Sequence, residues 1–272
     1  MRFAAIFSVA VLTTISTARA EMVPIEPPAG TADLGVRWMQ VKVADLGVMP
    51  IAIAQPLGKG PFPTVIILHG SHGFAREYVQ LARGFAQQGV LAVAPCWFSG
   101  GGGAGSRFIT PISCTGPPAI STAASSPAQN TVKALVSEVR ALPAVRGDAI
   151  ALFGHSLGGG TALNYAFVTG DIAAAVLDSA GYTDDQIRRV AQLKVAILIL
   201  HGSGDTSADG GSAFQTAARA RSFEAALRVA NKPVEAMYYK NAGHNGIFTD
   251  PRQMEDSVRR AAAFISRRPE TR

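Results

Sequence analysis

The sequence of 272 residues has few charged residues and two cysteines. Charged side chains make up 16% of the chain, and the formal net charge at pH 7 is +6. A balance this mild does not favour nucleic acid as a partner. Two cysteines without a cluster of histidines at ligand spacing do not make a zinc site, so we expect no metal. Because 48% of the residues are apolar, we expect a packed core rather than disorder.

The apolar run at the N-terminus is too short to be a membrane span. Residues 3–15 are uncharged and largely apolar, Arg2 precedes them, and Ala18-Arg19-Ala20 has the small-x-small pattern of a cleavage site. A helix that crosses a bilayer needs ~20 apolar residues. The pattern predicts a secretory signal peptide at residues 1–20. We therefore expect an exported protein, in a periplasm or outside the cell, with no stable membrane insertion after cleavage. Loss of Arg2 and Arg19 lowers the formal charge from +6 to +4.

Apolar stretches of strand length alternate with segments of helical periodicity along most of the chain. Residues 36–43 and 48–54 alternate apolar and polar side chains and predict an antiparallel hairpin at the edge of a sheet. Further strands are predicted at 64–68, 90–94, 149–153, 172–177, 195–200 and 234–239, and helices at 75–88, 128–142, 157–168, 212–230 and 251–265. This order predicts one α/β domain over residues 21–272, with a mostly parallel central sheet and helices on both faces.

One predicted strand leads directly into a glycine-rich turn around a serine. The apolar run 149–153 is followed by Gly-His-Ser-Leu-Gly at 154–158 and then by a predicted helix. A serine on such a sharp turn has a strained backbone and an exposed hydroxyl, and a Cβ at either glycine would crowd the neighbouring strand or helix. The pattern predicts Ser156 as a nucleophile.

A serine hydroxyl needs a base within hydrogen-bond reach, and that base needs an orienting acid. Of the five histidines, His201 and His244 follow Ser156, the order found in hydrolases that have this turn. His244 also follows a carboxylate at a later strand end, and its loop contains flanking glycines. We predict His244 as the base; the alternative is a loop histidine that hydrogen-bonds a nearby turn.

Three aspartates could orient His244. Asp205 lies in a glycine-rich turn just after the predicted strand 195–200, Asp178 follows the preceding strand, and Asp209 lies four residues beyond Asp205. The turn favours Asp205, and Asp178 remains its main rival. The aspartate that is not used would cap a turn through its own backbone.

Ester or amide cleavage through a serine also needs backbone N–H groups where the oxyanion develops. Leu157 follows the nucleophile at a helix N-terminus and is predicted to supply one. The turn after strand 64–68 reads His-Gly-Ser-His-Gly at 69–73 and is predicted to supply the other. Ser71 is the first choice in this turn and His72 the alternative.

Residues 95–127 form a long segment without a strand or helix pattern. Such a segment in a compact domain is usually functional, and we expect a loop over the active-site region. It contains Cys96 and Cys114, which predict a disulfide bond in an exported chain, with two buried thiols as the alternative. We expect an apolar substrate pocket, or core packing of the same rings, from His72, Trp97, Phe98, Phe108 and Phe248.

Together, the segments 68–73, 154–159, 201–205 and 243–244 resemble the α/β-hydrolase superfamily and, within it, the dienelactone hydrolase family. The resemblance covers nearly all of the mature chain. It implies a Ser156–Asp205–His244 triad that hydrolyses carboxylic esters and requires no metal or organic cofactor. Dienelactone hydrolases proper have cysteine where this chain has Ser156, which favours a general secreted esterase over cleavage of dienelactone.

The sequence thus predicts a secreted serine esterase that acts on a small-molecule ester. A peptidase or amidase on the same fold is one alternative, because a triad does not define its leaving group. A cutinase-like polyester hydrolase is a second, because it shares the serine turn and export. A binding protein without catalysis is a third, and it would be expected to lack part of the triad.

Overall fold

In the computed structural model, the described residues are 22–43, 47–100, 107–208 and 212–267. The signal peptide predicted at residues 1–20 lies outside them, as does Asp209. Among the described residues, no helix is both long and apolar enough to cross a bilayer.

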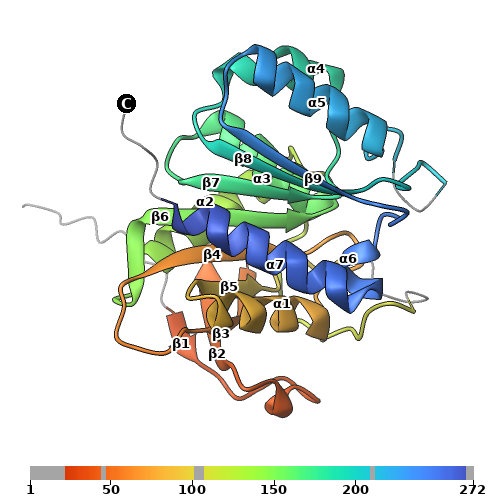
Figure 1. Ribbon diagram of the computed structural model, residues 1–272. Coiled ribbons are helices and arrows are strands. Elements are labelled where there is room, and N and C mark those ends of the chain that lie inside the picture. The colour runs from red at the N-terminus through yellow and green to blue at the C-terminus, as the bar shows by residue number, and fades with distance from the viewer. Residues whose placement is uncertain (1–21, 44–46, 101–106, 209–211, 268–272) are drawn as a thin grey trace, which may run out of the picture.

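The described residues form one mixed sheet in the strand order β1-β2-β3-β5-β4-β6-β7-β8-β9 (Figure 1). The first three strands run antiparallel to their neighbours, and the others pair in parallel. The strands are β1 (Met22–Pro24), β2 (Arg37–Val43), β3 (Gly47–Ala54), β4 (Phe62–Leu68), β5 (Leu91–Pro95), β6 (Val145–His155), β7 (Ala174–Asp178), β8 (Ala196–Gly202) and β9 (Val234–Tyr239). The predicted fold class is therefore confirmed, with its hairpin as β2 and β3.

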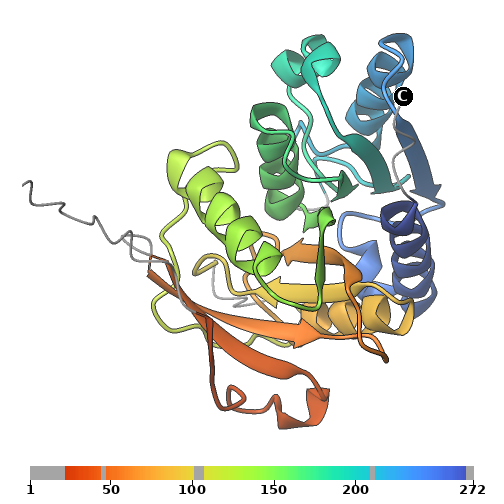
Figure 2. The ribbon, with the colours of Figure 1, turned by 90° about the vertical axis from the view of Figure 1, so that its left-hand side faces the viewer.

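Helices cover both faces of this sheet (Figure 2). The helices are α1 (Arg76–Gln87), α2 (Ser126–Arg140), α3 (Leu157–Val168), α4 (Asp184–Arg188), α5 (Ala217–Val229), α6 (Gly246–Thr249) and α7 (Pro251–Ser266), with short 3-10 turns at Ala32–Leu34 and Val190–Gln192. One core lies between the sheet and α2, α3 and α5, and a second lies between the sheet and α1 and α7. The central strands are therefore buried on both faces.

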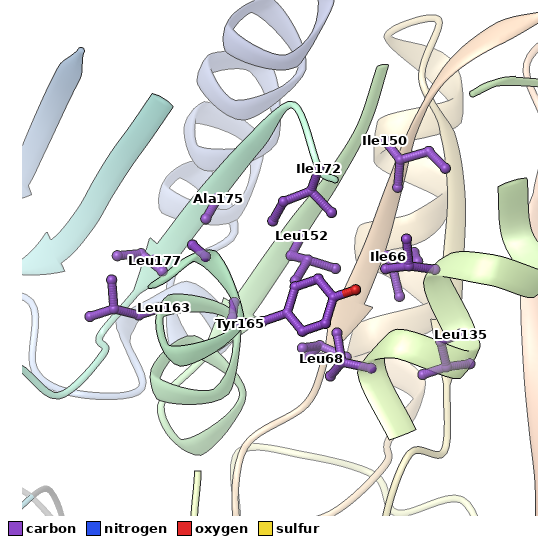
Figure 3. Packing of buried hydrophobic residues seen from close by; sticks show 14 of the residues in the cluster. Ile66, Leu68, Leu135, Ile150, Leu152, Leu163, Tyr165, Ile172, Ala175 and Leu177 are labelled. Carbon is purple, nitrogen blue, oxygen red and sulfur yellow. The ribbon is translucent and has the colours of Figure 1, made fainter. Parts of the chain in front are cut away.

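Alternation along β4 shows how one strand serves both cores. Ile66 and Leu68 belong to the core on the α2 and α3 side, and Val65 and Ile67 belong to the core on the α1 side. Figure 3 shows the first of these cores, where side chains of β4, β6 and β7 meet Leu135 of α2 and Tyr165 of α3. A strand that is buried on both faces needs apolar side chains at every position, and for this reason the continuous β-branched run predicts a strand.

The long segment that begins at Pro95 is attached to the fold at several points. Cys96 and Cys114 form the predicted disulfide bond. The Arg76 N–H donates to the Thr110 carbonyl at 2.9 Å, which holds the segment against the start of α1. The segment ends where Ser125 caps α2.

The structure differs from the predicted elements at the helix expected over 212–230. Here α5 begins only at Ala217, because the Thr216 side chain caps it by accepting from the Arg219 N–H. Residues 212–216 instead form a short segment without regular structure, which we call the strap. The sequence patterns do not predict the short elements β1, α4 and α6 or the two 3-10 turns. Of these, α4 begins with a capping box formed by Thr183 and Gln186.

Candidate active site

Ser156 lies on the sharp turn between β6 and α3, as predicted. Its backbone has φ 54° and ψ −114°, a strained conformation for a residue with a side chain. A Cβ on Gly154 would lie 2.2 Å from the Gly158 carbonyl oxygen, and a Cβ on Gly158 would lie 2.1 Å from the Leu68 carbonyl oxygen. Neither distance is possible, so the turn requires both glycines. The Ser156 N–H donates to the Asp178 carbonyl at 2.9 Å, which ties the turn to β7.

The structure brings Ser156, His244 and Asp205 together at the carboxyl ends of β6, β9 and β8. The distance from Ser156 Oγ to His244 Nε2 is 2.9 Å, and that from His244 Nδ1 to Asp205 Oδ2 is also 2.9 Å. All three residues are buried. An ionised carboxylate only accepts hydrogen bonds, so Asp205 requires the proton of neutral His244 on Nδ1. His244 Nε2 is then free to accept the Ser156 hydroxyl proton.

His201 is the second partner of Asp205. Its Nε2 lies 3.0 Å from Asp205 Oδ2 and 3.1 Å from the Gln215 carbonyl oxygen. Burial acts to raise the pKa of Asp205, but the hydrogen bonds from His201 and His244 outweigh it, and the pKa is lowered. Asp205 is therefore ionised at neutral pH. His201, the other histidine that follows Ser156, contacts the acid rather than the serine.

Asp178, the rival acid, is bonded to a different histidine. Asp178 and His155 are opposite each other in the register of β6 and β7, and His155 Nδ1 lies 2.6 Å from Asp178 Oδ2. Both side chains are buried. Burial raises the pKa of Asp178 to about 7 and lowers that of His155 well below its usual range. The geometry therefore favours Asp205 as the partner of His244.

Ser156 opens into a cavity of about 900 Å³. Ser71 and Leu157, the two residues predicted to donate backbone N–H groups to an oxyanion, line the same cavity. His72, the alternative, is not among the residues that line the cavity, and its side-chain Nε2 lies 2.7 Å from the Tyr78 hydroxyl. Other residues that line the cavity include Ser121, Thr122, Ala123, Gln129, Asn164, Phe167, Gln186, Phe214 and Gln215. The end of the long 95–127 segment thus reaches this cavity.

The five side chains expected to wall an apolar pocket do not line this cavity among the described residues. Trp97 is fully buried and donates from Nε1 to the His69 carbonyl at 3.1 Å, while Phe98 stacks on the His69 ring at 4.7 Å. Phe108 and Phe248 surround His72, with ring centroids 5.3 and 5.7 Å from its own. These four rings pack around His69 and His72, which is the core-packing arrangement that the sequence left open as the alternative.

Gln215 is the contact that sequence reasoning missed. Its Nε2 donates to Ser156 Oγ at 3.0 Å. Gln215 lies on the strap, ten residues after Asp205, and no residue pattern marks it. The available signal is its position: it follows the acid in a loop at the carboxyl end of β8, and such loops gather around the site in α/β sheets.

The comparisons with known proteins agree with this architecture. The sequence profile of the dienelactone hydrolase family matches residues 49–267. A putative dienelactone hydrolase from Klebsiella pneumoniae subsp. pneumoniae MGH 78578 is 21% identical, with a TM-score of 0.61 over 81% of this chain and 94% of that chain. Esterase Pf2001 of Pyrococcus furiosus is 15% identical, with a TM-score of 0.65 over 89% of this chain and 98% of that chain.

An acylaminoacyl peptidase of Pyrococcus horikoshii has the same fold in part of a longer chain. It is 14% identical, with a TM-score of 0.61 over 85% of this chain and 41% of that chain. At these identities, the solved structures show the fold alone. No curated protein matches this chain by sequence.

The histidines beside the site predict a loss of stability in acid. Burial lowers the pKa of both His69 and His72 to about 3, and for His72 the neighbouring His155 and His244 add to the effect. An unfolded histidine has a pKa near 6.5, so between these values the unfolded chain takes up protons that the folded chain does not. Their contribution to stability is present above pH ~6.5 and is lost as the pH falls toward 3.

We expect His72→Gln to reduce this pH dependence, because glutamine does not titrate and its carboxamide can still form a hydrogen bond with the Tyr78 hydroxyl. The measurement is the free energy of unfolding in urea at several pH values between 8 and 4. One linked proton contributes a slope of at most ~1.4 kcal/mol per pH unit, and the variant should lose a slope of up to this size. Equal slopes in the two proteins would contradict the assignment.

Proposed function

The chain belongs to the dienelactone hydrolase family and is a hydrolase of the α/β-hydrolase fold, and from this premise we propose that it cleaves carboxylic esters with Ser156 as the nucleophile. The observation that carries the proposal is the continuous hydrogen-bonded path from Asp205 through His244 to Ser156, with both distances at 2.9 Å. The path ends at a cavity of about 900 Å³, which can hold a small-molecule ester.

In the first half of the reaction, Ser156 Oγ attacks the carbonyl carbon of the ester while His244 Nε2 takes the hydroxyl proton. Asp205 holds the imidazole in the required tautomer and stabilises the imidazolium. The backbone N–H groups of Leu157 and Ser71 are proposed to hold the oxyanion, because both residues line the cavity beside Ser156. The intermediate then collapses, His244 protonates the leaving alcohol, and an acyl-enzyme remains.

In the second half, water enters the position that the alcohol has left. His244 takes a proton from the water while the oxygen of the water attacks the acyl carbon. The bond between that carbon and Ser156 Oγ breaks, the electron pair stays on Oγ, and His244 returns the proton to it. The acid is released and the free serine is restored.

We expect the purified protein to hydrolyse p-nitrophenyl butyrate and to cleave butyryl p-nitroanilide much more slowly. The two compounds share the acyl group, so the comparison isolates the leaving group. Ser156→Ala should reduce the ester rate by at least ~1,000-fold, because the nucleophile is removed. Anilide cleavage at the ester rate would favour a peptidase or amidase, and ester turnover that persists in Ser156→Ala would show that the nucleophile is wrongly assigned.

The two buried aspartates predict different results from the same substitution. Asp205→Asn should lower kcat/KM by ~1,000-fold to 10,000-fold, because an amide can donate to His244 Nδ1 and so favours the wrong tautomer. Asp178→Asn should cost less than ~10-fold, because His155 rather than His244 is its partner. Kinetics on p-nitrophenyl butyrate measure both, and thermal unfolding serves as the control for folding. An equal loss in the two variants would contradict the choice of Asp205.

A further inference from the structure

The Ser156 hydroxyl has a second partner besides His244, and the orientation of that partner is determined by the backbone. Gln215 Nε2 lies 3.0 Å from Ser156 Oγ. The other end of the same carboxamide, Oε1, lies 2.8 Å from the Ser212 backbone N–H. A backbone N–H can only donate, so the atom that faces it must be the amide oxygen. The amide nitrogen of Gln215 therefore faces the serine as a donor.

Hydrogen bonds connect the strap, and Ala217 directly after it, to residues around Asp205. The Gln215 carbonyl oxygen lies 3.1 Å from His201 Nε2, and the Ala217 N–H donates to the Asp205 carbonyl at 3.1 Å. The Tyr182 N–H donates to the Phe214 carbonyl at 2.9 Å. Five residues thus form a closed ring of hydrogen bonds, listed in order as Ser156, His244, Asp205, His201 and Gln215.

The ionised carboxylate sets the direction of the two bonds that His244 makes in this ring. Asp205 accepts from His244 Nδ1–H, so His244 Nε2 accepts from the Ser156 hydroxyl. A lone pair of Ser156 Oγ is then left to accept from Gln215 Nε2. Gln215 therefore stabilises electron density on the oxygen that attacks in the first half of the reaction and departs in the second.

We propose that Gln215 is a catalytic residue that acts mainly on deacylation. The proposal rests on the ester hydrolysis proposed above. A bond that is present both in the free hydroxyl and in the transition state of attack changes the rate of acylation little, because only differential stabilisation accelerates a step. In the acyl-enzyme, Oγ is an ester oxygen and a poor acceptor. As water attacks and the bond between the acyl carbon and Oγ breaks, Oγ gains negative charge and the bond from Gln215 is regained.

The test separates the two halves of the reaction with p-nitrophenyl butyrate. The value of kcat/KM reports acylation, and acid quenching followed by intact-protein mass measurement gives the fraction of enzyme held as acyl-enzyme in the steady state. Dividing kcat by this fraction gives the rate constant of deacylation. For Gln215→Leu, which keeps the approximate volume without the donor, we expect deacylation to slow by about 10-fold, the usual effect of one hydrogen bond. We expect kcat/KM to stay within about threefold.

Two further variants make the result specific. Gln215→Ala should give the same pattern, which guards against distortion by the leucine. Gln80→Leu, at an exposed position of α1, removes a carboxamide away from the site and should leave both constants unchanged. Equal loss of kcat/KM and deacylation in both Gln215 variants would show a structural role and overturn the proposal, as would unchanged deacylation. Absence of ester turnover in the unaltered protein would instead overturn the proposed function itself.

Discussion

The bond from His244 Nδ1 to the Asp205 carboxylate is the interaction on which the rest of the site depends. An ionised carboxylate accepts and never donates, so this one contact sets the tautomer of His244 and then the direction of the bond to Ser156. It is possible because β6, β8 and β9 are parallel and end at the same edge of the sheet. Ser156, Asp205 and His244, which are far apart in the sequence, therefore meet where these three strands end.

Two buried aspartates, each bonded to histidine, lie at this edge, and their surroundings give them different pKa values. Asp205 receives hydrogen bonds from His201 and His244, which keep its pKa low despite burial. Asp178 faces His155 without a second histidine, and burial raises its pKa to about 7. The backbone of Asp178 also accepts from the Ser156 N–H. We therefore assign the Asp178–His155 pair to holding the strained serine turn and the Asp205–His244 pair to the chemistry.

The sequence was sufficient where local geometry and chain order limit the possibilities. Gly158 lies so close to β4 that only glycine fits, and this requirement makes the serine turn recognisable in the sequence. The order of residues along the chain then selects His244. The sequence was insufficient for the cavity wall. Trp97 and Phe98 were chosen for their aromatic character, but they pack on His69, and nothing in a sequence states on which side of a loop a ring will lie. Gln215 is not predicted as a site residue because the sequence places residues 212–216 in the first turn of a helix, whereas α5 begins at Ala217.

The central claim is that the Asp205–His244 path makes Ser156 a nucleophile, and covalent labelling tests it most directly. The protein is treated with a fluorophosphonate probe, which reacts with activated serines, and the modified peptide is identified by mass spectrometry. We expect one probe per chain, attached to Ser156, and a labelling rate that falls by at least ~100-fold in His244→Ala. Attachment to another residue, or undiminished labelling of Ser156 in His244→Ala, would contradict it.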